Sequence, residues 1–186
     1  MSVLRIVSVD DKFFKDNDLY NLDNELIPNT ENNHNRPYVI VLKLKFRDKY
    51  QDFAIPFRSN IAGHRDKFEY FALPPRKETK PKNIHGLHFI KMLPIDSAYF
   101  IKYNYPTDSS SATLTKQYIQ KNLAKLVIEA QNYINKFEGG CRPSLCVDIG
   151  KIYDSIHKNK LLEKATTTIQ IVEGVNEEIE SNENNE

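Results

Sequence analysis

The sequence has few cysteines and no long hydrophobic run. Its two cysteines, Cys141 and Cys146, lie five positions apart, a spacing that predicts neither a disulfide framework nor a zinc site and that fits a reducing cytoplasm. No apolar run approaches the ~20 residues that a membrane-spanning helix needs. The first five residues lack the basic and apolar regions of a signal peptide. We therefore expect a cytoplasmic protein that does not enter a membrane.

The sequence also lacks the motifs of the commonest nucleotide-binding and acyl-transfer enzymes. It contains no Gly-x-x-x-x-Gly-Lys-Ser/Thr loop, no Gly-x-Gly-x-x-Gly and no Gly-x-Ser-x-Gly. The acidic residues of its central region are scattered, which disfavours a nuclease that binds a metal ion through paired carboxylates. We expect no cofactor.

Only one pair of histidines suggests a metal site. His85 and His88 have a spacing that can chelate a metal ion on a helix, but Gly86 and the neighbouring residues favour a strand. On a strand, positions three apart point to opposite faces. No other cysteine or acidic cluster completes a tetrahedral ligand set. We therefore predict no metal site, and a metal-dependent nuclease built on the two histidines stays open as a rival.

The composition of the 186 residues is that of one folded domain with a tail. Apolar residues make up 40% and charged residues 27%, which is ordinary for a globular protein. Residues 174–186 are rich in Glu and Asn and poor in apolar groups, which is typical of disorder. We expect a folded domain over residues 1–165 and an acidic, disordered tail over residues 174–186.

The net charge of +1 hides an asymmetry along the chain. Residues 1–160 hold 25 basic and 18 acidic residues, a net charge of +7, and residues 36–102 hold 14 Lys and Arg against 6 Asp and Glu. A basic body favours a polyanionic partner, although a solvated basic surface is an equally good explanation of the charge alone.

The clearest structural pattern is a hairpin in the centre of the chain. Residues 37–46 and 50–57 alternate in the way that strands do, and residues 47–49 connect them. Pro56 lacks a donor for the ladder, so pairing should stop or bulge near it. Arg58 and Ser59 should then lie on a loop at the mouth of the sheet, where reactive groups are commonly placed.

Other segments predict further strands and several helices. Apolar residues at spacings of three and four predict one long helix over residues 113–137, stopped by Gly139 and Gly140. Asp10 and Asp148 are each placed to cap a helix that follows. The remaining strands are expected over residues 4–9, 68–73, 86–95 and 98–103.

The central region gathers the side chains that metal-independent RNA cleavage requires. In that reaction the 2′-hydroxyl of the RNA attacks the adjacent phosphate, so the protein must move protons and stabilise negative charge. Hydroxyl, imidazole and guanidinium groups do this work. We predict as catalytic residues Ser59, Arg58, His64 and His85. We predict as RNA-binding residues Arg36, Tyr38, Lys43, Arg65, Arg76, Lys77, Lys80, Lys82 and His88. The alternatives are ordinary loop contacts or a non-catalytic RNA-binding module.

Three short apolar signatures occur in order along the chain. They are RPYVIVL at 36–42, FAIPFRSN at 53–60 and GLHFIKMLPI at 86–95. Together they resemble the toxins of type III toxin–antitoxin systems, the ToxN, AbiQ, TenpN and CptN group, over about residues 1–160. YFALPPR at 70–76 and HGLH at 85–88 are most similar to the CptN branch.

The resemblance implies an α+β fold in a single domain, with a twisted, highly curved antiparallel sheet surrounded by helices. It implies an endoribonuclease that leaves 2′,3′-cyclic phosphate and 5′-hydroxyl ends and limits phage infection. It also implies a repeated pseudoknot antitoxin RNA that inhibits the toxin by direct binding in a closed protein–RNA assembly.

The catalytic motif of this chain departs from that of ToxN. The Ser of the ToxN Thr-Ser-Pro-Lys motif falls on Ser59, but its Thr falls on Arg58 and its Lys falls on Ile61. Our hypothesis is that Arg58 supplies the missing cation, with His64 or His85 transferring protons.

Overall fold

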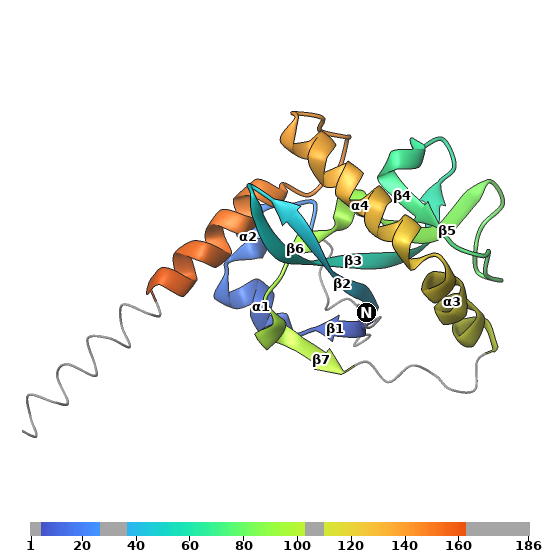
Figure 1. Cartoon of the computed structure of the whole chain (residues 1–186), viewed down its shortest axis with the longest axis horizontal. Helices are drawn as coiled ribbons and strands as arrows, with labels where there is room; N and C mark the ends of the chain where they lie inside the picture. The colour runs from blue at the N-terminus through green and yellow to red at the C-terminus, as the bar shows by residue number, and fades with distance from the viewer. Residues whose placement is uncertain (1–4, 27–36, 103–109, 163–186) are drawn as a thin grey trace, which may run out of the picture.

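One long strand organises a strongly curled antiparallel sheet (Figure 1). The structure is a computed structural model, and it describes residues 5–26, 37–102 and 110–162. The strands are β1 (Ile6–Val9), β2 (Pro37–Phe46), β3 (Lys49–Ala62), β4 (Tyr70–Ala72), β5 (Asn83–His88), β6 (Leu93–Pro94) and β7 (Phe100–Lys102). They lie in the order β4-β5-β3-β2-β1-β7, with β6 also paired to β3.

Helices cover the sheet on both sides. They are α1 (Asp11–Asp16), α2 (Leu19–Leu22), α3 (Ser110–Lys121), α4 (Leu123–Glu138) and a last helix over residues 149–162. The α+β fold with a curved antiparallel sheet is the one that the resemblance to type III toxins implies. None of the helices in the described ranges combines the length and apolar character of a membrane span.

The predicted hairpin is confirmed as β2 and β3. Arg47 and Asp48 connect the strands with φ angles of 47° and 59°, the left-handed pair that a two-residue hairpin turn requires. On β2, before the turn, the side chains of Leu42 and Leu44 are buried and that of Lys43 is exposed, as the alternation predicts.

The prediction that Arg58 and Ser59 follow the strand on a loop is wrong. Pairing between β2 and β3 does end at Pro56, but β3 continues to Ala62 by pairing with β5 on its other edge. A proline removes a hydrogen-bond donor from only the edge that its nitrogen faces, so the opposite edge stays available for a ladder. Both residues therefore lie on a strand, and the site is part of the sheet.

Two other expected elements are interrupted. The helix expected over residues 113–137 is divided at Asn122, whose side-chain Nδ2 and backbone N both donate to the Tyr118 carbonyl, at 2.8 and 3.1 Å. The strand expected over residues 86–95 is broken by a 3-10 turn at Phe89–Lys91, which separates the pairing of β5 with β3 from that of β6.

The predicted helix ends are confirmed. Asp10 accepts from Lys12 N at the start of α1, and Asp148 accepts from Lys151 N at the start of the helix over 149–162. Gly140 follows α4 with a φ of +90°, a conformation that glycine adopts without a steric penalty.

β3 contributes to two hydrophobic cores, one on each face of the sheet. Phe53 and Ile55 point toward α4, and Ala54 points toward α1 and the helix over 149–162. This division follows from the alternation of side chains along a strand.

β1 pairs with only the first residues of β2, and side chains of α4 cover the rest of that edge near Lys45. Gln131 Oε1 accepts from Lys45 N at 2.8 Å, and Gln131 Nε2 donates to the Lys45 carbonyl at 2.9 Å. Glu138 accepts from Arg47 N at 2.7 Å. Side chains of a helix thus satisfy backbone groups that a further strand would otherwise pair.

Candidate functional site

The predicted catalytic serine lies in a β-bulge between β3 and β5. Arg58 pairs with Gly86 and Ile61 pairs with Ile84, so Ser59 and Asn60 together oppose the single residue His85. A bulge adds a residue to one strand and redirects its side chains, and bulges are frequent beside active sites. Ser59 and Arg58 are both half-buried there.

Asn60 anchors the basic loop of residues 73–82 to this bulge. Its Oδ1 accepts from Lys80 N at 2.7 Å, and its Nδ2 donates to the Glu78 carbonyl at 3.4 Å. Just after the end of β3, a Cβ added to Gly63 would lie 2.0 Å from the Lys82 carbonyl oxygen, so the loop leaves no room for a side chain at this position. Asn60 is not among the predicted site residues, because no local pattern indicates a contact between residues 60 and 80.

His85 is buried between the bulge and the loop. Its ring stacks on Phe57 with centroids 6.2 Å apart, and its Nδ1 lies 2.7 Å from the Pro74 carbonyl oxygen. A carbonyl only accepts, so Nδ1 carries the proton and Nε2 is left as an acceptor. Nε2 is buried and has no hydrogen-bond partner among the described residues. Burial lowers the pKa of His85, with the nearby Arg76 acting in the same direction, so the ring is neutral.

His88 occupies the other face of β5, next to Arg58. It is 6% exposed, and neither ring nitrogen has a hydrogen-bond partner in the described part of the chain. Burial, followed by the positive charges of Arg58, Arg65 and Lys91, lowers the pKa of His88 to about 3. Three cations therefore surround a neutral imidazole.

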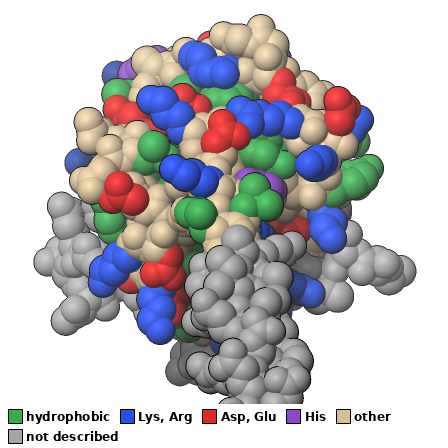
Figure 2. Space-filling model, turned by 90° about the vertical axis from the view of Figure 1, so that its left-hand side faces the viewer, with side chains coloured by type: hydrophobic (Ala, Val, Ile, Leu, Met, Phe, Trp, Pro, Cys, Tyr) green, Lys and Arg blue, Asp and Glu red, His purple; other side chains and the backbone are tan. Residues whose placement is uncertain are grey.

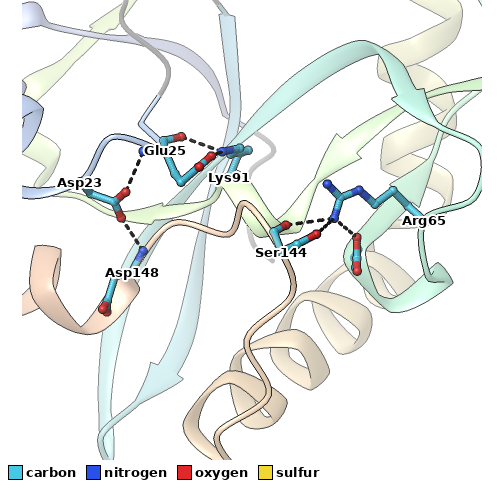
Figure 3. Close-up of polar contacts among 7 residues, drawn as sticks. Asp23, Glu25, Arg65, Lys91, Ser144 and Asp148 are labelled. Atoms are coloured by element: carbon cyan, nitrogen blue, oxygen red, sulfur yellow. Dashed lines mark hydrogen bonds and ion pairs between the residues drawn. The ribbon is translucent and has the colours of Figure 1, made fainter.

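Two of these cations are fixed by ion pairs (Figure 3). Arg65 Nη1 donates to Glu69 Oε2 at 3.2 Å and to the Ser144 carbonyl at 3.0 Å. Lys91 Nζ donates to the carboxylate and the carbonyl of Glu25, both at 2.7 Å. Lys91 is not among the predicted site residues. A single lysine within an apolar run is nevertheless a signal, because a buried charge needs a partner.

Hydrogen bonds of Asp23 connect the Lys91–Glu25 ion pair to the C-terminal part of the described chain. Asp23 accepts from Glu25 N at 2.8 Å and from Asp148 N at 2.6 Å, as Figure 3 shows. The environment of His88 is thereby joined to the segment after α2 and to the start of the last described helix.

Most of the other predicted residues lie on the loop or near the bulge. Lys77, Lys80 and Lys82 are exposed on the loop, and Arg76 is half-buried with its guanidinium 5.9 Å from the Phe57 ring centroid. His64 is exposed on the turn that follows β3. Arg36 and the side chain of Tyr38 lie outside the described part of the structure.

Lys43 is not brought together with these residues. It pairs across the hairpin with Asp52, six residues before Arg58 and so about 20 Å along β3. There it lines a polar cavity of about 220 Å³ with Asp96 and Lys160, which form an ion pair with each other. On the side shown in Figure 2, Lys and Arg side chains are interspersed with Asp and Glu. The positive charge of residues 36–102 is therefore divided between the loop near the bulge and the cavity that Lys43 lines.

Within the described ranges, no group of three or more His, Cys, Asp or Glu side chains is placed to hold a metal ion. His85 and His88 lie on opposite faces of β5, where their neighbours are Phe57 and Arg58 respectively.

Comparison with known proteins identifies the fold. No protein-family model and no curated protein matches the chain. A toxin from a bacterial type III toxin–antitoxin system, selectively inhibited by a non-coding RNA pseudoknot, is similar with a TM-score of 0.62 and 17% identity, covering 86% of this chain and 99% of that one. This chain has the fold of the type III toxins.

Two further type III toxin structures support the same conclusion. One, from a bacterial antiviral system regulated by a processed non-coding RNA, has a TM-score of 0.58 at 16% identity and covers 76% of this chain and 91% of its own. The other, the lactococcal anti-phage endoribonuclease AbiQ, has a TM-score of 0.51 at 16% identity and covers 72% of this chain and 79% of its own. The predicted resemblance to type III toxins is confirmed, and the finer assignment to the CptN branch remains a prediction.

Proposed function

We propose that this protein is the toxin of a type III toxin–antitoxin system and cleaves RNA without a metal ion. The observation that carries the proposal is the type III toxin fold, which extends over 86% of this chain and 99% of the compared toxin. The fold is also that of AbiQ, an anti-phage endoribonuclease. The basic loop over the bulge adds local support, because it offers cations beside a serine.

The proposed reaction uses only groups of the RNA and the protein. The 2′-oxygen of one nucleotide attacks its own 3′-phosphorus, which forms a P–O2′ bond and breaks the P–O5′ bond. The 2′-hydroxyl proton goes to a base, and the departing 5′-oxygen receives a proton. The products are a 2′,3′-cyclic phosphate and a 5′-hydroxyl, and no water is consumed.

The bulge suggests a role for each candidate residue. Ser59 holds the 2′-oxygen or a phosphate oxygen, and Arg58 stabilises the negative charge of the pentavalent phosphorane. His64 is exposed, so RNA can reach it without a change in the fold. His85 is 2% exposed and binds Pro74, so its role at the start of the reaction is to position the basic loop, unless RNA binding displaces that loop.

The RNA contacts extend outward from the bulge. Arg76, Lys77, Lys80 and Lys82 would bind phosphates on the loop side, and Arg65 and His88 would support Arg58 from the other face of the sheet. Arg36, Tyr38 and Lys43 remain predicted contacts of a longer RNA. The same surface would bind a repeated pseudoknot antitoxin RNA, which would inhibit the toxin in a closed assembly.

The chemistry can be tested by incubating the purified protein with a mixed RNA pool, with and without EDTA, and mapping the new ends. Cyclic-phosphate and 5′-hydroxyl ends in the presence of EDTA are the expected result. Cleavage abolished by EDTA would instead indicate a metal-dependent nuclease. RNA binding without cleavage, after removal of any co-purified RNA, would indicate a binding module.

The site is tested by Ser59→Ala and Arg58→Ala. Each variant should keep the fold and lose about 10²- to 10³-fold in cleavage rate, the loss typical when one group that stabilises a developing negative charge is removed. Matched controls are Ser97→Ala and Lys12→Ala, because both residues are exposed and lie on other elements. Unchanged cleavage by both site variants would contradict the assignment.

The inhibitor is tested by purifying the protein from cells that carry its native locus. The expected result is a complex whose absorbance shows RNA and whose mass, from light scattering, exceeds that of one chain. Recovery of a free, active nuclease from such cells would argue against an antitoxin RNA.

A further inference from the structure

A second pocket lies beside β4, the strand at one end of the sheet. It has a volume of about 210 Å³ and lies between β4 and the helices α3 and α4. Its lining consists of Lys67, Tyr70, Phe71, Ala72, Tyr118, Lys125 and Glu129. Pockets that enclose a drug-sized ligand measure about 300–1,000 Å³, so this one is suited to a single planar ring system.

The lining combines an aromatic surface with positive charge. Tyr118 is 38% exposed and lies with its ring centroid 6.4 Å from that of Phe71. Lys125 Nζ is 6.0 Å from the Phe71 centroid, and its ion pair with Glu129 is loose, at 3.7 Å. Exposed ion pairs contribute little stability, so the Lys125 ammonium and the Glu129 carboxylate can each bind a ligand. Lys67 is also exposed at the pocket.

The pocket is close to the bulge in the plane of the sheet. Ala72 of the pocket pairs with Gly86, and Gly86 pairs with Arg58 on its other side. Two strand spacings, about 10 Å, therefore separate the backbone of Ala72, in the pocket wall, from the backbone of Arg58. A single RNA strand can reach both places within a few nucleotides.

We propose that this pocket binds one unpaired base of an RNA whose backbone also lies at the bulge. The base stacks on Tyr118, and Lys67 and Lys125 bind the phosphates on either side of it. Glu129 only accepts hydrogen bonds, so it favours guanine, which presents two adjacent donors on its pairing edge. This inference rests on the proposed function and adds to it a second recognition site that selects the base near the cleaved bond.

The experiment compares RNA binding by Tyr118→Ala and by Leu114→Ala. Leu114 lies one turn earlier on α3, is 61% exposed and does not line the pocket, so it is the matched control. The probes are short 2′-O-methyl RNA oligonucleotides, one of uridines only and one with a single central guanine. They lack the 2′-hydroxyl and so remain uncleaved during the measurement.

We expect wild type to prefer the guanine-containing probe. Tyr118→Ala should weaken its binding about tenfold, Tyr118→Phe should restore it, and Leu114→Ala should match wild type. Glu129→Gln should bind both probes alike. Equal binding by Tyr118→Ala and wild type would overturn the pocket assignment.

The outcomes separate this inference from the proposed function. If wild type cleaves RNA and Tyr118→Ala binds like wild type, the pocket assignment fails and the nuclease stands. If the pocket variants lose binding but wild type cleaves no RNA, the nuclease fails and the pocket stands. If wild type binds neither probe and no RNA, both fail.

Discussion

The two halves of β3 have different surroundings. From Lys49 to Pro56 the strand pairs with β2 and β6, and its centre at Phe53 and Ile55 is fully buried. From Phe57 to Ala62 it pairs with β5 through the bulge, and Arg58 and Ser59 are half-buried. One strand therefore serves as a scaffold in its first half and as a candidate site in its second.

The two environments show how a reactive group can be held rigidly and still remain accessible. The buried half fixes the direction of the strand, because its side chains pack on both faces of the sheet. The bulged half keeps its backbone pairing with β5, while Asn60 bonds the loop and Arg58 lies beside His88 on the other face. A site on a strand is placed more precisely than a site on a free loop.

The largest expected difference between the halves is in stability. Phe53→Ala should lower the free energy of unfolding by about 3–5 kcal/mol, because it leaves a cavity in the core between the sheet and α4. Ser59→Ala should change it by no more than about 0.5 kcal/mol. Urea unfolding measures both, and similar losses in the two variants would contradict the division of the strand.

A smaller effect should come from pH, through His88. Its folded-state pKa of about 3 lies below the unfolded value of about 6.5, so the unfolded chain binds the proton first as pH falls. The free energy of unfolding should therefore fall by about 2 kcal/mol between about pH 7 and pH 5, and continue to fall toward pH 3. Urea unfolding across this range measures the slope.

His88→Leu is the matched variant for this prediction. It removes the titrating group and the two unpaired nitrogens, so its stability should change less with pH than that of wild type. The buried His85 also has a lowered pKa and should leave part of the slope in place. An identical slope in the two proteins would show that His88 is not the group responsible.

The smallest expected effect concerns the attachment of the loop. Asn60→Ala removes the hydrogen bond to Lys80 N, which should cost about 1 kcal/mol of stability. It should also reduce cleavage by about fivefold, the rate equivalent of about 1 kcal/mol, because the loop cations become less well positioned. The control is Asn21→Ala in α2, which removes an exposed side-chain hydrogen bond to Asp18, the residue before the helix. Asn60 has no positioning role if both variants cleave RNA equally well.

Local patterns in the sequence predict much of this fold. The alternation in residues 37–57 predicts the hairpin, and Asp10, Asp148 and the glycines after residue 138 predict helix ends that the structure confirms. These features depend on neighbours in the chain, so composition and periodicity contain enough information.

The arrangement of the site depends instead on distant contacts. Asn60 meets Lys80, and Lys91 meets Glu25 across 66 residues, through side chains that no periodicity relates. The continuation of β3 past Pro56 depends on the position of β5, and the break at Asn122 involves neither glycine nor proline. Charge totals likewise group Lys43 with the loop cations, although Asp52 is its cross-strand neighbour.

The contact between Gln131 and the backbone of Lys45 has a consequence for how the protein opens. The backbone N–H and carbonyl of Lys45 both bond Gln131 of α4. The Lys45 amide therefore loses its protection from hydrogen exchange when the helix undocks, even if the β2–β3 hairpin stays paired. Its hydrogen-exchange rate therefore reports the undocking of α4, whereas the amides that pair β2 with β3 report the opening of the sheet. Comparing the two rates would reveal whether helix and hairpin unfold as one cooperative unit.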